Sequence, residues 1–248
     1  MKSAKLVRSE IRGLTTTRMP LAFLAVLGVF AILNAAVAVW GSDADGTKTF
    51  LSTAIDQASF VSFSANSVII AGLFGATAVA RGYGHGTVVH RFLATPRRFG
   101  AALAQFTAVA LGGAVLGLAG VAMTAGAVAL VLPTTEFGFL ISTGDMIRLL
   151  AASSFAGAAG ALLGGGIGAL VRNTGGAVTG AVLMLVIAPP LVVQLVGGAA
   201  SWIPPTLANV LSGVSSEVTV VAAIAALVLW AGIPTAVGLV STVKRDVV

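Results

Sequence analysis

Residues 20–40 read PLAFLAVLGVFAILNAAVAVW, a run without a charged side chain. A helix needs roughly 20 mostly apolar residues to cross the hydrocarbon core of a bilayer, so this run is long enough for one crossing. Five further stretches resemble it in length and in carrying charges only near their ends. Together the six runs predict transmembrane helices over residues 20–40, 60–80, 100–132, 146–171, 177–196 and 218–240.

The composition of the chain supports the same fold class. Of its 248 residues, 57% are hydrophobic and only 9% are charged, whereas about 25% of a soluble domain is charged. This excludes a soluble enzyme, a disordered chain and a nucleic-acid-binding domain. Since no linker divides the chain, we expect one all-α, polytopic membrane domain over residues 1–248. The chain has no cysteine, which excludes disulfides and cysteine chemistry.

The basic residues are divided unevenly between the two predicted sides of the membrane. Most lie on the side that carries both termini: Lys2, Lys5, Arg8, Arg12, Arg18, Arg81, Arg91, Arg97, Arg98, Arg172, Lys244 and Arg245. The other side keeps Lys48 and Arg148, together with most of the acidic residues. Because basic residues mark the cytoplasmic side, we expect a multi-pass protein of the cell membrane with both termini in the cytoplasm.

The segment before the first span has an amphipathic pattern. Val7, Ile11 and Leu14 follow one another at helical spacing, with basic residues on the other faces. This pattern predicts a helix within residues 1–18 that lies in the inner headgroup layer, and Pro20 marks the break before the first span. A signal peptide cleaved after Ala36-Val37-Ala38 is the less favoured alternative.

The loop between the second and third spans reads RGYGHGTVVHRFLATPRR over residues 81–98. Thr87 can cap a short helix, and Val88, Val89, Phe92 and Leu93 would then form one apolar stripe. Such a stripe with a basic rim suits either the groove of a partner protein or the lipid surface. The residue pattern alone leaves both alternatives open.

The Lys-Leu-x-Arg-Ser-Glu start, the Arg81–Arg98 run and, more weakly, Arg172-Asn173-Thr174 resemble the permease subunit of type-2 ATP-binding-cassette (ABC) exporters of actinobacteria. The resemblance implies that the N-terminal helix is the elbow helix of that family and that the loop holds its coupling helix. It also implies that ATP and Mg²⁺ bind a separate cytosolic ATPase, and that Trp202 belongs to a hairpin that caps the translocation path. The residues that would couple to the ATPase are Thr87, Val88, Val89, Arg91, Phe92, Leu93, Arg97 and Arg98. Gly82 and Gly84 depart from the family pattern, which usually has charged residues there.

Small and polar residues mark further positions inside the spans. Glycines recur at a spacing of four, which lets helix backbones approach closely within one bundle or across a dimer; they are Gly113, Gly117, Gly160, Gly164 and Gly168. Pro189 and Pro190 must bend the fifth span or break its hydrogen bonds. Residues that could line a path or gate, or bond across helices, are Asn66, Pro189, Pro190, Gln194 and Trp202.

Catalytic and metal-binding patterns are not found in the sequence. His85 and His90 have no third ligand close by, and no acidic residue sits in the middle of a span, where an ion-coupled transporter usually keeps one. We therefore expect no enzyme activity and no cofactor on this chain. The expected function is export of lipophilic cargo, with a second permease copy, identical or homologous, and with lipids as further partners. A non-transporting immunity or assembly factor and, less favoured, an ion-coupled secondary transporter remain alternatives.

Overall fold

The computed structural model describes residues 2–42, 49–84 and 98–244, and within these ranges the chain forms helices and no strand. The helices are α1 (Lys2–Thr15), α2 (Met19–Trp40), η1 (Thr49–Leu51), α3 (Ala54–Ser64), α4 (Ser67–Gly84), α6 (Arg98–Val131), η2 (Leu132–Thr134), α7 (Thr143–Val171), α8 (Thr174–Val182), η3 (Leu183–Ile187), α9 (Ala188–Leu195), η4 (Gly197–Trp202), α10 (Pro204–Ser212) and α11 (Val220–Lys244). Of these, η1, η2 and η4 are 3₁₀ turns, and η3 is a π-helical turn.

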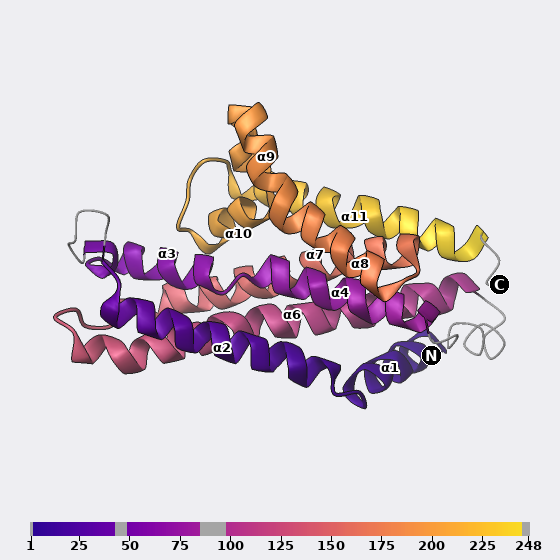
Figure 1. Cartoon of the computed structure of the whole chain (residues 1–248), viewed down its shortest axis with the longest axis horizontal. Helices are drawn as coiled ribbons and strands as arrows, with labels where there is room; N and C mark the ends of the chain where they lie inside the picture. The colour runs from indigo at the N-terminus through magenta and orange to yellow at the C-terminus, as the bar shows by residue number, and fades with distance from the viewer. Residues whose placement is uncertain (1, 43–48, 85–97, 245–248) are drawn as a thin grey trace.

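Six helical segments are long and apolar enough to cross a membrane, which confirms the predicted fold class. They are Met19–Trp40, Ala54–Tyr83, Phe99–Thr134, Thr143–Val171, Thr174–Leu195 and Val220–Lys244. The chain is therefore an all-α, multi-pass membrane protein. Figure 1 shows the long helices running side by side, with α1 and the end of α11 at the same end of the bundle. We call this the terminal end, and the opposite one the far end.

The helices divide into an inner and an outer group. Buried residues make up 65% of the most apolar part of Ala54–Tyr83 and 61% of that of Thr143–Val171, but only 17% of that of α2 and of α11. Helix α7 lies at the centre and packs against α4, α6 and α11. The outer helices expose large apolar side chains, such as Ile32 on α2 and Val221 on α11. This surface suits lipid tails, with which apolar side chains mix freely.

The second span is broken, whereas the sequence predicted one helix over residues 60–80. Asn66 separates α3 from α4 with a left-handed φ of 45°, a conformation that asparagine tolerates better than most residues. Its carbonyl oxygen accepts the amides of Ile69 and Ile70, both at 3.1 Å. Residues 41–59, between the first two predicted spans, are partly helical as well, because a capping box of Thr53 and Asp56 starts α3 at Ala54.

The fifth span changes its hydrogen bonding just before Pro189 and Pro190. The amide of Ala188 bonds to the carbonyl of Leu183, five residues back, which closes the π-helical turn η3. Since proline has no amide hydrogen, the two prolines also remove donors from the next turn. Beyond η3, α9 points away from the bundle (Figure 1). Residues 197–217, between the last two predicted spans, are partly helical too, because they contain η4 and α10.

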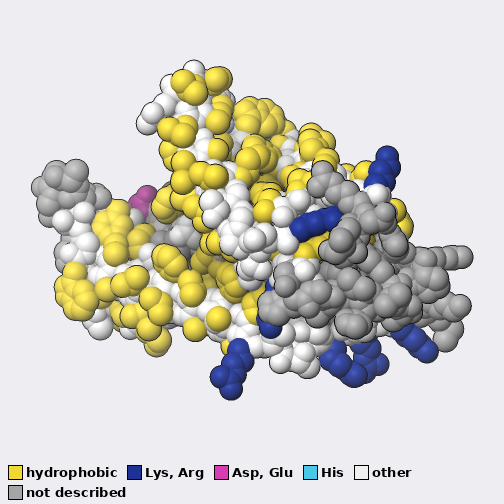
Figure 2. All heavy atoms as spheres, turned by 45° about the vertical axis from the view of Figure 1, so that its right-hand side comes forward, with side chains coloured by type: hydrophobic (Ala, Val, Ile, Leu, Met, Phe, Trp, Pro, Cys, Tyr) yellow, Lys and Arg dark blue, Asp and Glu magenta, His cyan; other side chains and the backbone are white. Residues whose placement is uncertain are grey.

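Charged side chains mark the two ends of the bundle differently. On the face shown in Figure 2, Lys and Arg side chains gather toward the terminal end, and acidic side chains are visible only toward the far end. At the far end, the carboxylates of Asp56 and Asp145 take part in the N-caps of α3 and α7. Acidic groups there interact favourably with the positive end of each helix dipole.

Candidate functional site

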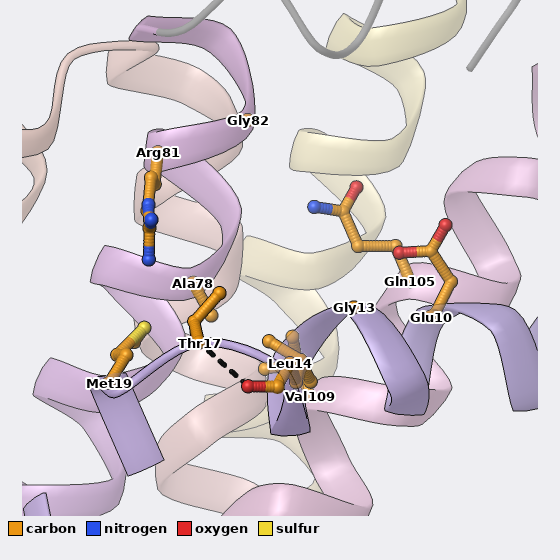
Figure 3. A pocket seen from close by; sticks show the side chains of 10 residues that line it. All are labelled: Glu10, Gly13, Leu14, Thr17, Met19, Ala78, Arg81, Gly82, Gln105 and Val109. Carbon is orange, nitrogen blue, oxygen red and sulfur yellow. Dashed lines mark hydrogen bonds between the residues drawn. The ribbon is translucent and has the colours of Figure 1, made fainter. Parts of the chain in front are cut away.

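A polar cavity opens at the terminal end between α1, α4 and α6. It holds about 300 Å³ and is lined by Glu10, Gly13, Leu14, Thr17, Met19, Ala78, Arg81, Gly82, Gln105 and Val109. In the view of Figure 3, the Gln105 amide lies between Arg81 on one side and Glu10 on the other. An acid, a base and an amide from three different helices therefore line one space.

Gln105 is the buried member of this group. Its side chain is only 8% exposed, and no hydrogen-bond partner for it is found among the described residues. Its amide atoms do not belong to the buried, unpartnered side-chain atoms of the described residues, so they are accessible from the cavity. Since Gln105 lines the cavity, a polar group inside the cavity would satisfy it.

The local sequence explains why α1 lies across the bundle and leaves this space. The threonine hydroxyls at the end of α1 donate to carbonyls three residues back, Thr15 to Arg12 at 3.1 Å and Thr17 to Leu14 at 2.8 Å. The Arg12 carbonyl also accepts the Thr16 amide at 2.9 Å, and the Leu14 carbonyl accepts the Thr17 amide at 3.4 Å, so the hydroxyls reinforce the last turn of the helix, where carbonyl groups have few helical donors. The chain then restarts as α2 with Pro20 in its first turn, where proline is well accommodated. Helix α1 packs against α6.

A second, apolar cavity of about 290 Å³ lies beside the first. Its lining residues are Ile11, Leu14, Thr15, Pro20, Leu24, Phe74, Ala108, Leu111, Gly112, Val115 and Leu116. Leu14 lines both cavities and packs against the largest buried cluster of the bundle. The apolar stripe that the sequence predicts on the N-terminal helix thus anchors α1 through Leu14, while Ile11 stays 36% exposed.

Three helices are tied together at the terminal end by a group that we call the clasp: Tyr83, Arg172, Ser241 and Thr242. Arg172 donates to the Ser241 carbonyl at 2.8 Å, and its guanidinium carbon lies 5.1 Å from the centre of the Tyr83 ring. The hydroxyls of Tyr83 and Thr242 are 2.7 Å apart. Arg172 Nε is buried and has no partner among the described residues. The clasp thereby joins the ends of α4, α7 and α11.

The spaced glycines lie at contacts between helices of this one chain. A methyl group on Gly164 would overlap the Gly72 carbonyl of α4, and one on Gly168 would stand 2.7 Å from the Ala76 oxygen. On α6, a methyl group on Gly117 would overlap the Ser153 carbonyl of α7. A methyl group on Gly160 would likewise overlap the Val68 carbonyl of α4, and one on Gly113 would overlap the Gly157 carbonyl of α7. Helix α7 is therefore held between α4 and α6 at backbone contact.

The residues singled out for a path or gate are scattered over the structure. Asn66 forms the break in the second span and lines a small cavity of about 30 Å³. Pro189 is buried, whereas Pro190 and Gln194 are exposed on the fifth span. Trp202 is 48% exposed, and its carbonyl accepts the indole N–H of Trp230 at 3.0 Å. The structure does not bring these residues into one site.

The polar contacts of Gln57 at the far end were not predicted from the sequence. Gln57 is fully buried; its amide nitrogen donates to Leu51 and Gly138 at 3.1 and 2.8 Å, and its oxygen accepts the Leu140 amide at 2.8 Å. It joins α3 to the segment before α7. Gln57 lies one helical turn before the buried Val61, and this spacing would have revealed it if the predicted helix had started earlier.

The proposed ATPase-coupling residues fall mostly outside the described part of the chain. Thr87, Val88, Val89, Arg91, Phe92, Leu93 and Arg97 lie in the undescribed range 85–97, as do His85 and His90. Arg98 is the first residue of α6. Within the described residues, no group of three or more His, Cys, Asp or Glu side chains could hold a metal ion.

Comparison with known proteins adds no assignment to this geometry. No family model matches the sequence, and no curated protein matches it.

Proposed function

We propose that the chain is the permease subunit of an ATP-driven ABC exporter and works with a separate cytosolic ATPase. In this proposal both termini and the terminal end face the cytoplasm. The position of most basic residues at one end of the bundle supports that orientation. The chain supplies the path and the docking surface, and the partner hydrolyses ATP.

One observation carries the proposal: the arrangement of α1, α4 and α6 at the terminal end. An amphipathic helix precedes the first span, ends before Arg18, and packs on α6. The sequence that resembles the coupling segment joins the ends of α4 and α6 at the same place. An elbow helix beside a coupling segment is what the resemblance to type-2 permeases implies.

The close glycine contacts favour a path between two permease copies over a path through one. The α4–α7 and α6–α7 contacts leave no room for a methyl group at several positions. Protein interiors packed so closely do not open without moving whole helices. A second copy, identical or homologous, would supply the other wall. The apolar surfaces of the outer helices favour lipophilic cargo.

Phe92 is the residue to change in a test of coupling. It is the largest apolar side chain of the stripe, and truncating an interface anchor typically costs about 2 kcal/mol or more. Phe92→Ala should therefore release the co-purifying ATPase from the tagged full-length chain, or uncouple ATP hydrolysis from export. Arg97→Ala is the matched control and should do less, because a rim charge stays solvated. Normal ATPase binding and export by Phe92→Ala would refute the coupling role.

The orientation can be tested separately, because the native chain has no cysteine. Cysteines at Ser42 and Thr134, both exposed near the far end, should react with a membrane-impermeant thiol reagent added to intact cells. A cysteine at Thr95 should react only after the cells are opened. Labelling of Thr95 in sealed cells would reverse the orientation.

A further inference from the structure

The apolar cavity beside α1 is closed toward the bundle and open toward the bilayer. Phe74, Ala108 and Leu116 form its closed side, because all three are buried. Leu111 and Val115 also line it, but their side chains are 49% and 62% exposed. Since the outer surface of a span faces lipid in a multi-pass protein, a lipid tail can enter the cavity sideways from the bilayer.

The cavity extends from the junction of α1 and α2 into the depth of the bundle. Ile11 and Thr15 of α1 line one part of it, together with Pro20 in the first turn of α2. On α6 its lining residues extend from Ala108 to Leu116, about 12 Å at 1.5 Å per residue. Figure 1 shows α1 at the terminal end and α2 leading away from it. The mouth at α1 therefore lies nearest the surface of the predicted bilayer, and the rest lies deeper.

Two arginines lie on the face of α1 that borders this mouth. Arg12 precedes Thr15 by three residues and Arg8 precedes it by seven, so all three share one face of the helix. Both arginines are exposed, and neither guanidinium has a hydrogen bond or an ion pair with another described residue. Helical side chains lean toward the N-terminus of their helix, which for α1 is the side of the bilayer surface. The two positive charges thus lie above the apolar space.

The start of α2 adds to the positive potential at the mouth. Its N-cap residue, Arg18, makes no side-chain bond to the helix, and the amide end of a helix attracts anions. No acidic residue lines the apolar cavity. The acidic residue of α1, Glu10, lines the polar cavity instead.

We propose that the apolar cavity holds one acyl chain of an anionic phospholipid, whose phosphate lies at Arg8, Arg12 and the start of α2. Arginine N–H groups bind phosphate oxygens strongly, and a lipid whose head group adds an ammonium would bring a positive charge to this basic face. Burying a chain in the cavity gains little over leaving it in the bilayer, since lipid tails are as apolar as the lining side chains. The head group therefore provides the selectivity, and the cavity fixes the position of the lipid.

This inference does not require the export function, because it depends only on residues of this chain and on a bilayer around it. The test measures which lipid stays with the full-length chain. The protein is placed in nanodiscs of phosphatidylcholine that contain equal small amounts of phosphatidylglycerol and phosphatidylethanolamine, and the retained lipids are counted by native mass spectrometry. We expect phosphatidylglycerol to be retained over phosphatidylethanolamine by about tenfold or more, equivalent to about 1.4 kcal/mol.

Two arginine variants test the head-group contacts. Arg8→Gln and Arg12→Gln should each reduce the preference about fivefold, which corresponds to about 1 kcal/mol per basic residue near an anionic surface. Lys244→Gln is the matched control, because it removes an exposed positive charge at the same end of the bundle, on α11. It should keep the preference of the wild type.

A tryptophan variant tests the cavity itself. Val115→Trp places a bulky ring at the open side and should lose the retained phosphatidylglycerol. Leu118 is also exposed on α6, lies about one turn further along and lines neither cavity, so Leu118→Trp should retain the lipid. Because both side chains are exposed, we expect both variants to keep the thermal unfolding midpoint of the wild type in detergent, which separates lipid loss from misfolding.

A competition experiment shows whether one chain enters. Lysophosphatidylglycerol, which has a single acyl chain, should displace the retained lipid, whereas soluble glycerophosphoglycerol, which has none, should not.

Three results would overturn the proposal. Equal retention of both lipids by the wild type would mean that only non-selective surface lipid is present. A preference that falls as much with Lys244→Gln as with Arg8→Gln and Arg12→Gln would mean that the charge of the whole terminal end attracts the lipid. Normal retention by Val115→Trp, or equally efficient displacement by glycerophosphoglycerol, would mean that the cavity takes no chain. None of these results bears on the Phe92→Ala experiment, so the two proposals fail separately.

Discussion

The α4–α7 contact and the contact of α1 with α6 represent opposite ways of packing two helices. Along α7, Gly160, Gly164 and Gly168 bring the backbones so close that an added methyl group would meet α4 backbone atoms. Beside α1, Gly13 faces open space, and a cavity lies on each side of Leu14. Because close packing is a main source of helix association in membranes, we infer that the first contact contributes more to the stability of the fold than the second.

The largest expected difference in the free energy of unfolding comes from placing a leucine side chain in each of the two contacts, at Gly164 and at Gly13. Gly164→Leu would force α7 away from the Gly72 carbonyl, and overpacking typically costs about 1–3 kcal/mol and occasionally more, with the upper end expected here because backbone must move. Gly13→Leu should not lower stability, because no atom lies within 4 Å of the new Cβ and leucine favours a helix more than glycine does. The measurement is the free energy of unfolding of each full-length variant in mixed detergent micelles.

Ala158→Leu is a further control on α7. Ala158 is half-buried and lies two residues before Gly160, so it points to roughly the opposite face of the helix. Ala158→Leu should lower the free energy of unfolding by less than Gly164→Leu does. Equal losses at Gly164, Ala158 and Gly13 would show that bulk alone, and not the closeness of α4 and α7, determines the effect.

A smaller difference in the free energy of unfolding is expected between alanine variants of Gly117 and Gly112, which both lie on α6. A methyl group on Gly117 would meet the Ser153 backbone, whereas one on Gly112 would meet ring carbons of Phe74 at 2.8 and 2.9 Å. Phe74 lines the apolar cavity, so its ring has space to turn. We expect Gly117→Ala to cost about 1–3 kcal/mol, and Gly112→Ala about 1 kcal/mol or less, the cost of an off-rotamer side chain. The reverse order in the same unfolding measurement would show that the cavity does not relieve the contact.

The sequence predicts the spans well because length and absence of charge are local properties. The first span was predicted over residues 20–40 and is observed over Met19–Trp40. The break at Asn66 was missed because a left-handed φ at a single asparagine leaves no mark on hydropathy. Residues 54–59 of α3 and all of α10 lie outside the predicted spans, because each helix is short, and Thr53 and Pro204 mark their starts more clearly than periodicity does.

The candidate site could be predicted only in part. The amphipathic pattern of residues 1–18 predicts the helix, and Gln105 stands out as a polar residue in an apolar run. The cavity around Gln105 depends on how far α1 stays from α4, and these helices are more than 50 residues apart in the chain. Gly13 and Gly164 are likewise the same residue type in the sequence. Only the distance between the helices distinguishes the open space at Gly13 from the backbone contact at Gly164.

The smallest expected effect on the free energy of unfolding is at Tyr83. Its neighbour Gly82 lines the polar cavity, while Tyr83 itself belongs to the clasp. The Thr242 hydroxyl already donates to the Gly238 carbonyl at 2.8 Å. A hydroxyl has one hydrogen, so Tyr83 must be the donor in its bond to Thr242.

Tyr83→Phe removes this donor and leaves the bond from Thr242 to Gly238 intact. No buried group is left without a partner, and interhelical hydrogen bonds in membrane proteins average about 0.6 kcal/mol. We therefore expect a loss of about that size in the free energy of unfolding. A double-mutant cycle with Thr242→Val isolates the coupling between the two hydroxyls. A loss of about 2 kcal/mol or more from Tyr83→Phe alone, well above that average, would mean that the clasp, and not the glycine contact, holds the end of α4 in place.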